Sequence, residues 1–82
     1  MTSIDCVLHG SLEDNLPDGH QGNCIPLEFA TTPSVDEILA RLGIGREYLQ
    51  FILADGCYIE LQDWEKPAIG ERFQLWPRIS GG

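Results

Sequence analysis

The most constraining feature of this sequence is a short helix with a recognisable signal at each end. Ser34 and Glu37 have the spacing of a capping box, in which each side chain binds the backbone amide of the other residue. Gly43 stands where helices commonly end in a left-handed residue. Apolar residues between these ends recur at helical spacing: Val35, Ile38, Leu39 and Leu42. We therefore expect a helix over about residues 35–42, which is too short to be stable unless it packs against a sheet.

Two segments before this helix have the composition of β-strands. Residues 4–9 and 23–30 are rich in apolar residues, and the polar stretch 11–22 between them is rich in turn formers. The two segments are expected to pair as an antiparallel hairpin with a long loop. Pro26 predicts that the second strand lies at an edge or a bulge of the sheet, because proline has no N–H to donate.

Three further strands are predicted after the helix. Residues 49–54 form an apolar run, and the following Asp55-Gly56 pair is typical of a tight hairpin turn that needs positive φ angles. Residues 57–61 are expected to return alongside it. A longer polar connection leads to a last strand at 72–76, which ends at Pro77.

This order of elements predicts an α+β domain in which one helix packs across one face of a mixed sheet of four or five strands. Residues 1–77 form the domain, and residues 78–82 form a C-terminal tail without a structural signal. An 82-residue chain has room for one small core, and we expect no second domain.

Strand alternation predicts which side chains face away from the helix. If Phe51 points toward the helix, its neighbour Ile52 points to the open face of the sheet, and in the last strand Trp76 does the same. We therefore expect Ile52 and Trp76 to form an exposed apolar patch near the tail that binds a partner. The alternative is that Trp76 folds onto the edge of the domain and only covers the core.

Composition and charge exclude several classes of function. The net charge of −8 and the five scattered basic residues argue against nucleic-acid binding. No apolar run approaches the roughly 20 residues of a membrane helix, and the N-terminus lacks the features of a secretory signal, so we expect a cytoplasmic protein. The acidic surface either supports docking to a basic partner or only keeps the protein in solution.

The residues that most often carry chemistry are few and dispersed. Cys6, Cys24 and Cys57 are widely spaced and predict free thiols in a reducing compartment rather than a metal or redox site. His9 and His20 have no evident catalytic partner and are expected to be surface or structural residues. We therefore expect no metal site and no enzymatic activity of the chain's own.

The order of elements and the ending Gly81-Gly82 resemble the ubiquitin-like β-grasp fold. Within it, the chain is similar to prokaryotic sulfur carriers of the MoaD/ThiS type, which include the small subunit of molybdopterin synthase and the sulfur carrier of thiamine biosynthesis. The resemblance is carried by residues 34–44 (SVDEILARLGI), 51–56 (FILADG) and 69–82 (IGERFQLWPRISGG). The chain departs from the family pattern at residue 55, where Asn is commoner, at Cys57, and at 76–78, where an aromatic residue is usually followed by two prolines.

The resemblance implies a carrier protein that acts as a co-substrate. The carboxylate of Gly82 would be adenylated by a ubiquitin-activating-type enzyme, which uses ATP, and then converted to a thiocarboxylate by a sulfur donor. Gly81, Ser80 and Ile79 would thread the channel of that enzyme, since glycine has no Cβ to obstruct a narrow passage. The carrier binds no cofactor itself and delivers sulfur to an acceptor enzyme or to the large subunit of a synthase.

We expect these partners to bind the surface that strand alternation predicts near the tail. It consists of Ile52, Trp76, Pro77 and Arg78. The sequence leaves the pathway open between molybdopterin, thiamine and tRNA thiolation. It also leaves open a ubiquitin-like modifier that is conjugated to proteins through Gly82, and a β-grasp interaction module without chemistry.

Overall fold

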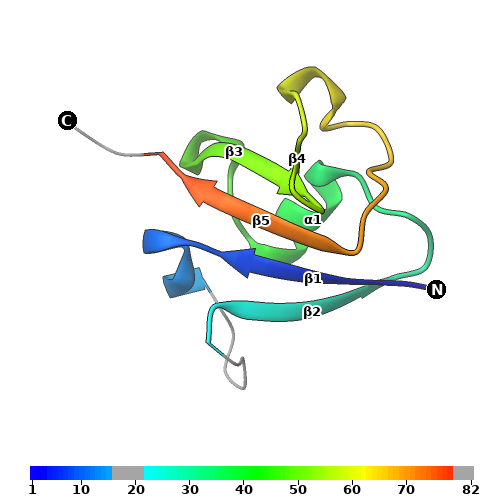
Figure 1. Cartoon of the computed structure of the whole chain (residues 1–82), viewed down its shortest axis with the longest axis horizontal. Coiled ribbons are helices and arrows are strands. Elements are labelled where there is room, and N and C mark those ends of the chain that lie inside the picture. The colour runs from blue at the N-terminus through cyan, green and yellow to red at the C-terminus, as the bar shows by residue number, and fades with distance from the viewer. Residues whose placement is uncertain (16–21, 79–82) are drawn as a thin grey trace.

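In a computed structural model, which describes residues 1–15 and 22–78, five strands form one sheet and a single α-helix packs across one of its faces (Figure 1). The elements are β1 (Thr2–Leu8), β2 (Cys24–Phe29), α1 (Val35–Leu42), β3 (Leu49–Ala54), β4 (Cys57–Tyr58) and β5 (Arg72–Pro77). Short 3₁₀ helices occupy Gly10–Asn15, Arg46–Tyr48 and Leu61–Asp63. The predicted α+β class is confirmed, and β4 is shorter than the predicted strand over 57–61.

The strand order β2-β1-β5-β3-β4 places the C-terminal strand in the middle of the sheet. β1 and β5 are parallel, and every other neighbouring pair is antiparallel. β2 is an edge strand, as Pro26 predicts, and this proline lies opposite Asp5 of β1. Because β5 is central, this strand ends at Pro77 in the middle of one end of the sheet (Figure 1).

Helix α1 has the predicted bounds and both predicted end signals. The Glu37 amide donates to Ser34 Oγ at 3.1 Å, and the Ser34 amide donates to Glu37 Oε1 at 3.2 Å. Gly43 ends the helix with a φ of 74°. The apolar stripe of the helix is buried against the sheet: Val35, Ile38, Leu39 and Leu42. A two-turn helix thus gains its stability from the core that it covers.

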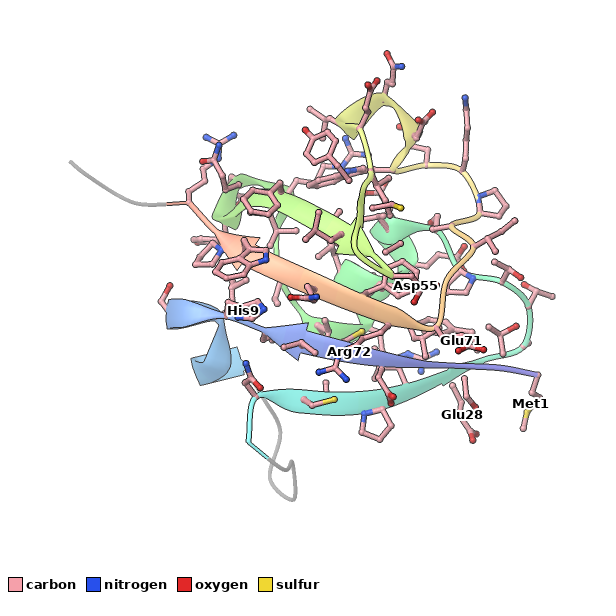
Figure 2. All side chains as sticks on the ribbon, viewed as in Figure 1. Met1, His9, Glu28, Asp55, Glu71 and Arg72 are labelled. Atoms are coloured by element: carbon pink, nitrogen blue, oxygen red, sulfur yellow. The ribbon has the colours of Figure 1, made fainter. Side chains whose placement is uncertain are left out.

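The turn between β3 and β4 is tied to the start of β5 by one side chain. Asp55 and Gly56 both have positive φ angles, 50° and 86°, as the predicted turn requires. The Asp55 carboxylate accepts hydrogen bonds from the backbone amides of Glu71, at 3.1 Å, and Arg72, at 2.9 Å. Figure 2 shows Asp55 and Glu71 close together where β5 begins. The Asp55 side chain therefore reinforces a junction that the sheet already makes, since the Asp55 amide also donates to the Arg72 carbonyl at 2.8 Å.

The prediction that Ile52 lies on the open face is wrong. Ile52 is completely buried in the core with Leu75, its partner in β5. The ladder between β3 and β5 shifts its register between Leu49 and Phe51. This irregularity reverses the alternation after Leu49, so Leu49 and Ile52 both face α1 while Phe51 points to the opposite face.

Candidate functional site

The residues predicted to react or to thread a partner's channel lie outside the described residues. They are Ile79, Ser80, Gly81 and Gly82. The structure describes the chain up to Arg78, which follows the end of β5. Because β1 and β5 are parallel, this point lies at the same end of the sheet as His9, the residue after β1. Figure 2 shows His9 at this end.

Four rings form a row across the open face of the sheet at this end, and we call them the aromatic row: His9, Trp76, Phe51 and Tyr58. They come from the end of β1 and from β5, β3 and β4, which are successive neighbours in the sheet. Their ring centroids are separated by 3.7, 5.8 and 6.5 Å along the row. The two longer distances are typical of interacting aromatic pairs, and the shortest places the His9 and Trp76 rings in direct face-to-face contact.

The row lies on the face opposite α1. Trp76 pairs with Phe51 in the ladder, and the next pair, Leu75 with Ile52, is buried under the helix. Because side chains of neighbouring residues on a strand point to opposite faces, Trp76 and Phe51 face away from α1. Trp76 is 36% exposed and Tyr58 is 61% exposed. The predicted outward orientation of Trp76 is confirmed.

Three residues of the row were not predicted from the sequence to belong to the site: His9, Phe51 and Tyr58. His9 is the one that lies beyond the end of its strand. Its backbone amide donates to the Leu75 carbonyl at 3.0 Å, which extends the parallel ladder beyond β1. The imidazole is therefore placed beside Trp76, where the two rings are nearly parallel, with an angle of 8° between their planes. In its Nε2–H tautomer, His9 also donates to Gln74 Oε1 at 3.1 Å. Stacking and this hydrogen bond together fix the orientation of the imidazole.

Pro77 and Arg78 connect the row to the end of the described chain. Pro77 is half-buried and packs beside Gly10, where an added Cβ would lie only 3.0 Å from Pro77 Cγ. Arg78 donates its backbone amide to the Tyr48 carbonyl at 3.0 Å and its Nε to the Leu49 carbonyl at 3.2 Å. Of the predicted partner-binding residues, the structure therefore brings together Trp76, Pro77 and Arg78.

Acidic residues outnumber basic residues on the described surface. Three basic residues already have partners within the domain: Arg41, Arg46 and Lys66. Arg78 is exposed at the end of the sheet that carries the aromatic row, and Arg72 is exposed at the other end of β5. A surface with a net charge of −8 around an apolar row would be complemented by a partner with basic residues around an apolar centre.

The three thiols differ sharply in accessibility. Cys6 is fully buried, Cys24 is half-buried and Cys57 is exposed, and all three are free. Burial raises the pKa of the Cys6 thiol to about 12, and the nearby Cys24 and Asp5 add to this shift. A thiol that keeps its proton is a poor nucleophile, so Cys6 serves the core rather than chemistry.

Residues 1–15 and 22–78 contain no cluster of three or more His, Cys, Asp or Glu side chains that could hold a metal ion. Within these same ranges, no helix is both long enough and apolar enough to cross a membrane. The aromatic row and the neighbouring chain end are therefore the features of the described surface on which a functional proposal can be built.

Comparison with known proteins adds no relative to this description. A scan against protein-family models, a search of curated proteins and a search of solved structures each found no match.

Proposed function

We propose that this chain is a cytoplasmic sulfur carrier with a β-grasp fold, whose C-terminal carboxylate at Gly82 is adenylated and converted to a thiocarboxylate. The observation that carries the proposal is the position of β5. This strand lies in the centre of the sheet, and the described chain ends just after it at Arg78, beside an exposed row of rings and four residues before Gly82.

The strand order and the single helix support a β-grasp fold for this domain. A hairpin, a crossing helix and three further strands follow the chain order on which the resemblance to sulfur carriers rests, and the mixed sheet with β5 between β1 and β3 is compatible with it. In this arrangement the folded domain would fix the point at which its own C-terminal tail begins. The chain would then need no catalytic side chain, because the partner enzyme supplies the nucleotide and the acid-base groups.

The chemistry requires an ionised carboxylate that can enter another protein. A C-terminal carboxyl group has a pKa of about 3.5 and is ionised at neutral pH. One of its oxygens attacks the α-phosphorus of ATP, and pyrophosphate leaves with the bond electrons. Hydrosulfide then attacks the acyl carbon of the adenylate, and AMP leaves. The product is a thiocarboxylate on Gly82, whose sulfur is the nucleophile for an acceptor enzyme.

The aromatic row would dock the carrier on its partners. Trp76 and Tyr58 are large, partly exposed and held by their neighbours, and such side chains dominate the energetics of protein interfaces. The excess of acidic residues would speed the encounter with an adenylating enzyme or an acceptor enzyme that carries basic residues. Both partners would need to recognise the same end of the sheet, because both act on the same tail.

The experiment is thiolation in a purified system. The full chain is incubated with ATP, sulfide and each ubiquitin-activating-type enzyme of the source organism, and its intact mass is measured. We expect a gain equal to the difference between one sulfur and one oxygen atom, and no gain for a chain that lacks Gly82. Thiolation of the shortened chain, or no reaction with any of these enzymes, would overturn the proposal. Higher-mass conjugates that depend on Gly82 in cells would instead assign the same tail to protein modification.

A further inference from the structure

Arg78 is attached to the beginning of β3 through both its backbone and its side chain. Its amide donates to the Tyr48 carbonyl at 3.0 Å, and its Nε donates to the Leu49 carbonyl at 3.2 Å. These two carbonyls belong to consecutive residues. The residue that follows β5 is thus held by the last residue of the 3₁₀ helix Arg46–Tyr48 and by the first residue of β3.

The two hydrogen bonds lie beside the last pair of the ladder between β3 and β5. Leu49 is the ladder partner of Pro77. The Arg78 amide binds the residue before Leu49, which is the pattern of an antiparallel pair that exchanges no backbone hydrogen bonds of its own. The Nε of Arg78 then gives the Leu49 carbonyl a donor. Arg78 therefore extends the attachment of the chain one residue beyond the ladder, through its backbone and its side chain.

We infer that Arg78 is a positioning residue that fixes where the C-terminal tail begins, an inference that rests on the proposed carrier function. Beyond Arg78 the chain has residues 79–82. Four fully extended residues span at most about 13–14 Å. The nucleotide of the adenylating enzyme must then lie within this distance of the end of β5, next to the aromatic row.

Fixing Arg78 affects the adenylation step more than the docking step. A residue with a free backbone would add conformations in which the Gly82 carboxylate points away from the nucleotide. In the proposed function the aromatic row supplies the docking contacts, and we assign Arg78 to positioning the tail in place of the partner contact expected from the sequence. Loss of the attachment should therefore lower kcat for adenylation and leave the KM for the carrier nearly unchanged.

Two variants separate the attachment from the charge of the side chain. In Arg78→Gln, the amide nitrogen occupies the same place along the side chain as the arginine Nε, so the variant keeps a donor for the Leu49 carbonyl and loses the charge. In Arg78→Lys, a methylene group occupies that place, and the charge is kept one bond further out. A role in fixing the tail predicts that Gln replaces Arg better than Lys does.

The experiment measures ATP–pyrophosphate exchange by the adenylating enzyme at varied concentrations of the full-length carrier, with folding checked by circular dichroism. Amide hydrogen exchange at residue 78 is measured by NMR on the carrier alone. We expect Arg78→Gln to stay within about twofold of wild type in kcat and KM, which is less than the effect of one net hydrogen bond. Arg78→Lys should lose about fivefold in kcat at unchanged KM, and its residue 78 amide should exchange faster than in wild type.

The inference is overturned if Arg78→Lys keeps the wild-type kcat, or if Arg78→Gln loses as much as Arg78→Lys. An equal loss in Arg78→Gln would show that the partner recognises the positive charge of Arg78. If the wild-type chain supports no exchange with any adenylating enzyme, the proposed function fails. The amide exchange rates then decide the attachment alone: a faster rate in Arg78→Lys than in Arg78→Gln supports it, and equal rates overturn it.

Discussion

The imidazole of His9 and the indole of Trp76 stack face to face, with ring centroids 3.7 Å apart and planes inclined by 8°. The two residues are far apart in the chain and meet because β1 and β5 run parallel in the centre of the sheet. The stack covers one face of a tryptophan that is still 36% exposed. It therefore presents the indole in a fixed orientation at the surface from which the tail departs.

Replacing His9 by alanine should free the indole without unfolding the domain. An aromatic pair contributes about 0.5–1.5 kcal/mol, so we expect His9→Ala to lower the free energy of unfolding by about that amount. His9→Phe keeps a ring in the stack and should lose less. Urea unfolding measures both variants, and equal losses for the two substitutions would show that the stack does not contribute.

Trp76→Ala tests the docking role of the aromatic row. Truncating an aromatic hot spot commonly costs 2 kcal/mol or more, so we expect the affinity for the adenylating enzyme to fall by about 30-fold. Ile69→Ala is the matched control, because Ile69 is 90% exposed and lies outside the row. Titration by calorimetry gives both dissociation constants. Equal affinities of wild type and a folded Trp76→Ala protein would contradict the docking role.

The irregularity in β3 makes a prediction about two adjacent side chains. Ile52 is fully buried and Phe51 is half-buried on the opposite face. Ile52→Val should lower the free energy of unfolding by about 0.5–1.5 kcal/mol and leave partner binding unchanged. Phe51→Leu should weaken partner binding through the aromatic row while the core stays intact. Stability is measured by urea unfolding and binding by titration. If Ile52→Val instead weakened binding and Phe51→Leu instead lowered stability, the assignment of Ile52 to the core and Phe51 to the open face would be wrong.

Asp55 should contribute more to the free energy of unfolding than its exposed position suggests. Asp55→Ala removes the acceptor for the amides of Glu71 and Arg72 and places alanine at a φ of 50°. We expect a loss of about 1–2 kcal/mol in the free energy of unfolding, mainly from the left-handed alanine, because the exposed amides of Glu71 and Arg72 can bind water instead. Asp55→Asn keeps both an acceptor oxygen and tolerance of positive φ, and should lose under about 1 kcal/mol. Urea unfolding that finds the two variants equal would rule out this explanation.

The sequence was sufficient for features that depend on residues close together in the chain. The bounds of α1 follow from Ser34, Glu37 and Gly43, whose interactions are completed within the helix and its caps. The turn at Asp55-Gly56 follows from local φ preferences. The edge position of β2 follows from Pro26, because a missing N–H excludes a central strand.

Features that depend on pairing between distant segments of the chain could not be predicted from the local sequence. The shift at Gln50 belongs to the ladder between β3 and β5, and no residue type in the run from Leu49 to Ala54 requires it. Ile52 was therefore assigned to the wrong face, and Phe51 was missed as part of the site. His9 was missed because its stacking partner lies on a strand that only the folded sheet brings beside it.

Cys6 gives the chain a pH dependence with a definite sign. Burial, with smaller contributions from Cys24 and Asp5, raises the pKa of its thiol from 9.0 to about 12. Above pH 9 the unfolded chain loses this proton and the folded chain keeps it, so the folded state binds more protons. The stability that is fully present below pH 9 should therefore be lost as the pH rises toward 12, by at most about 4 kcal/mol.

The slope of stability against pH isolates this contribution. Urea unfolding is followed from pH 8 to about 10.5 for wild type and for Cys6→Ala, which lacks the thiol but keeps every other titrating group. Cys6→Ala should be less stable throughout because it leaves a cavity, yet its stability should fall less steeply above pH 9. Parallel curves of stability against pH for the two proteins would contradict the raised pKa of Cys6.

The exposed Cys57 supplies an internal comparison for the accessibility of Cys6. Iodoacetamide should modify Cys57 in the folded protein well before Cys6, because the Cys6 thiol becomes reactive only when the domain opens.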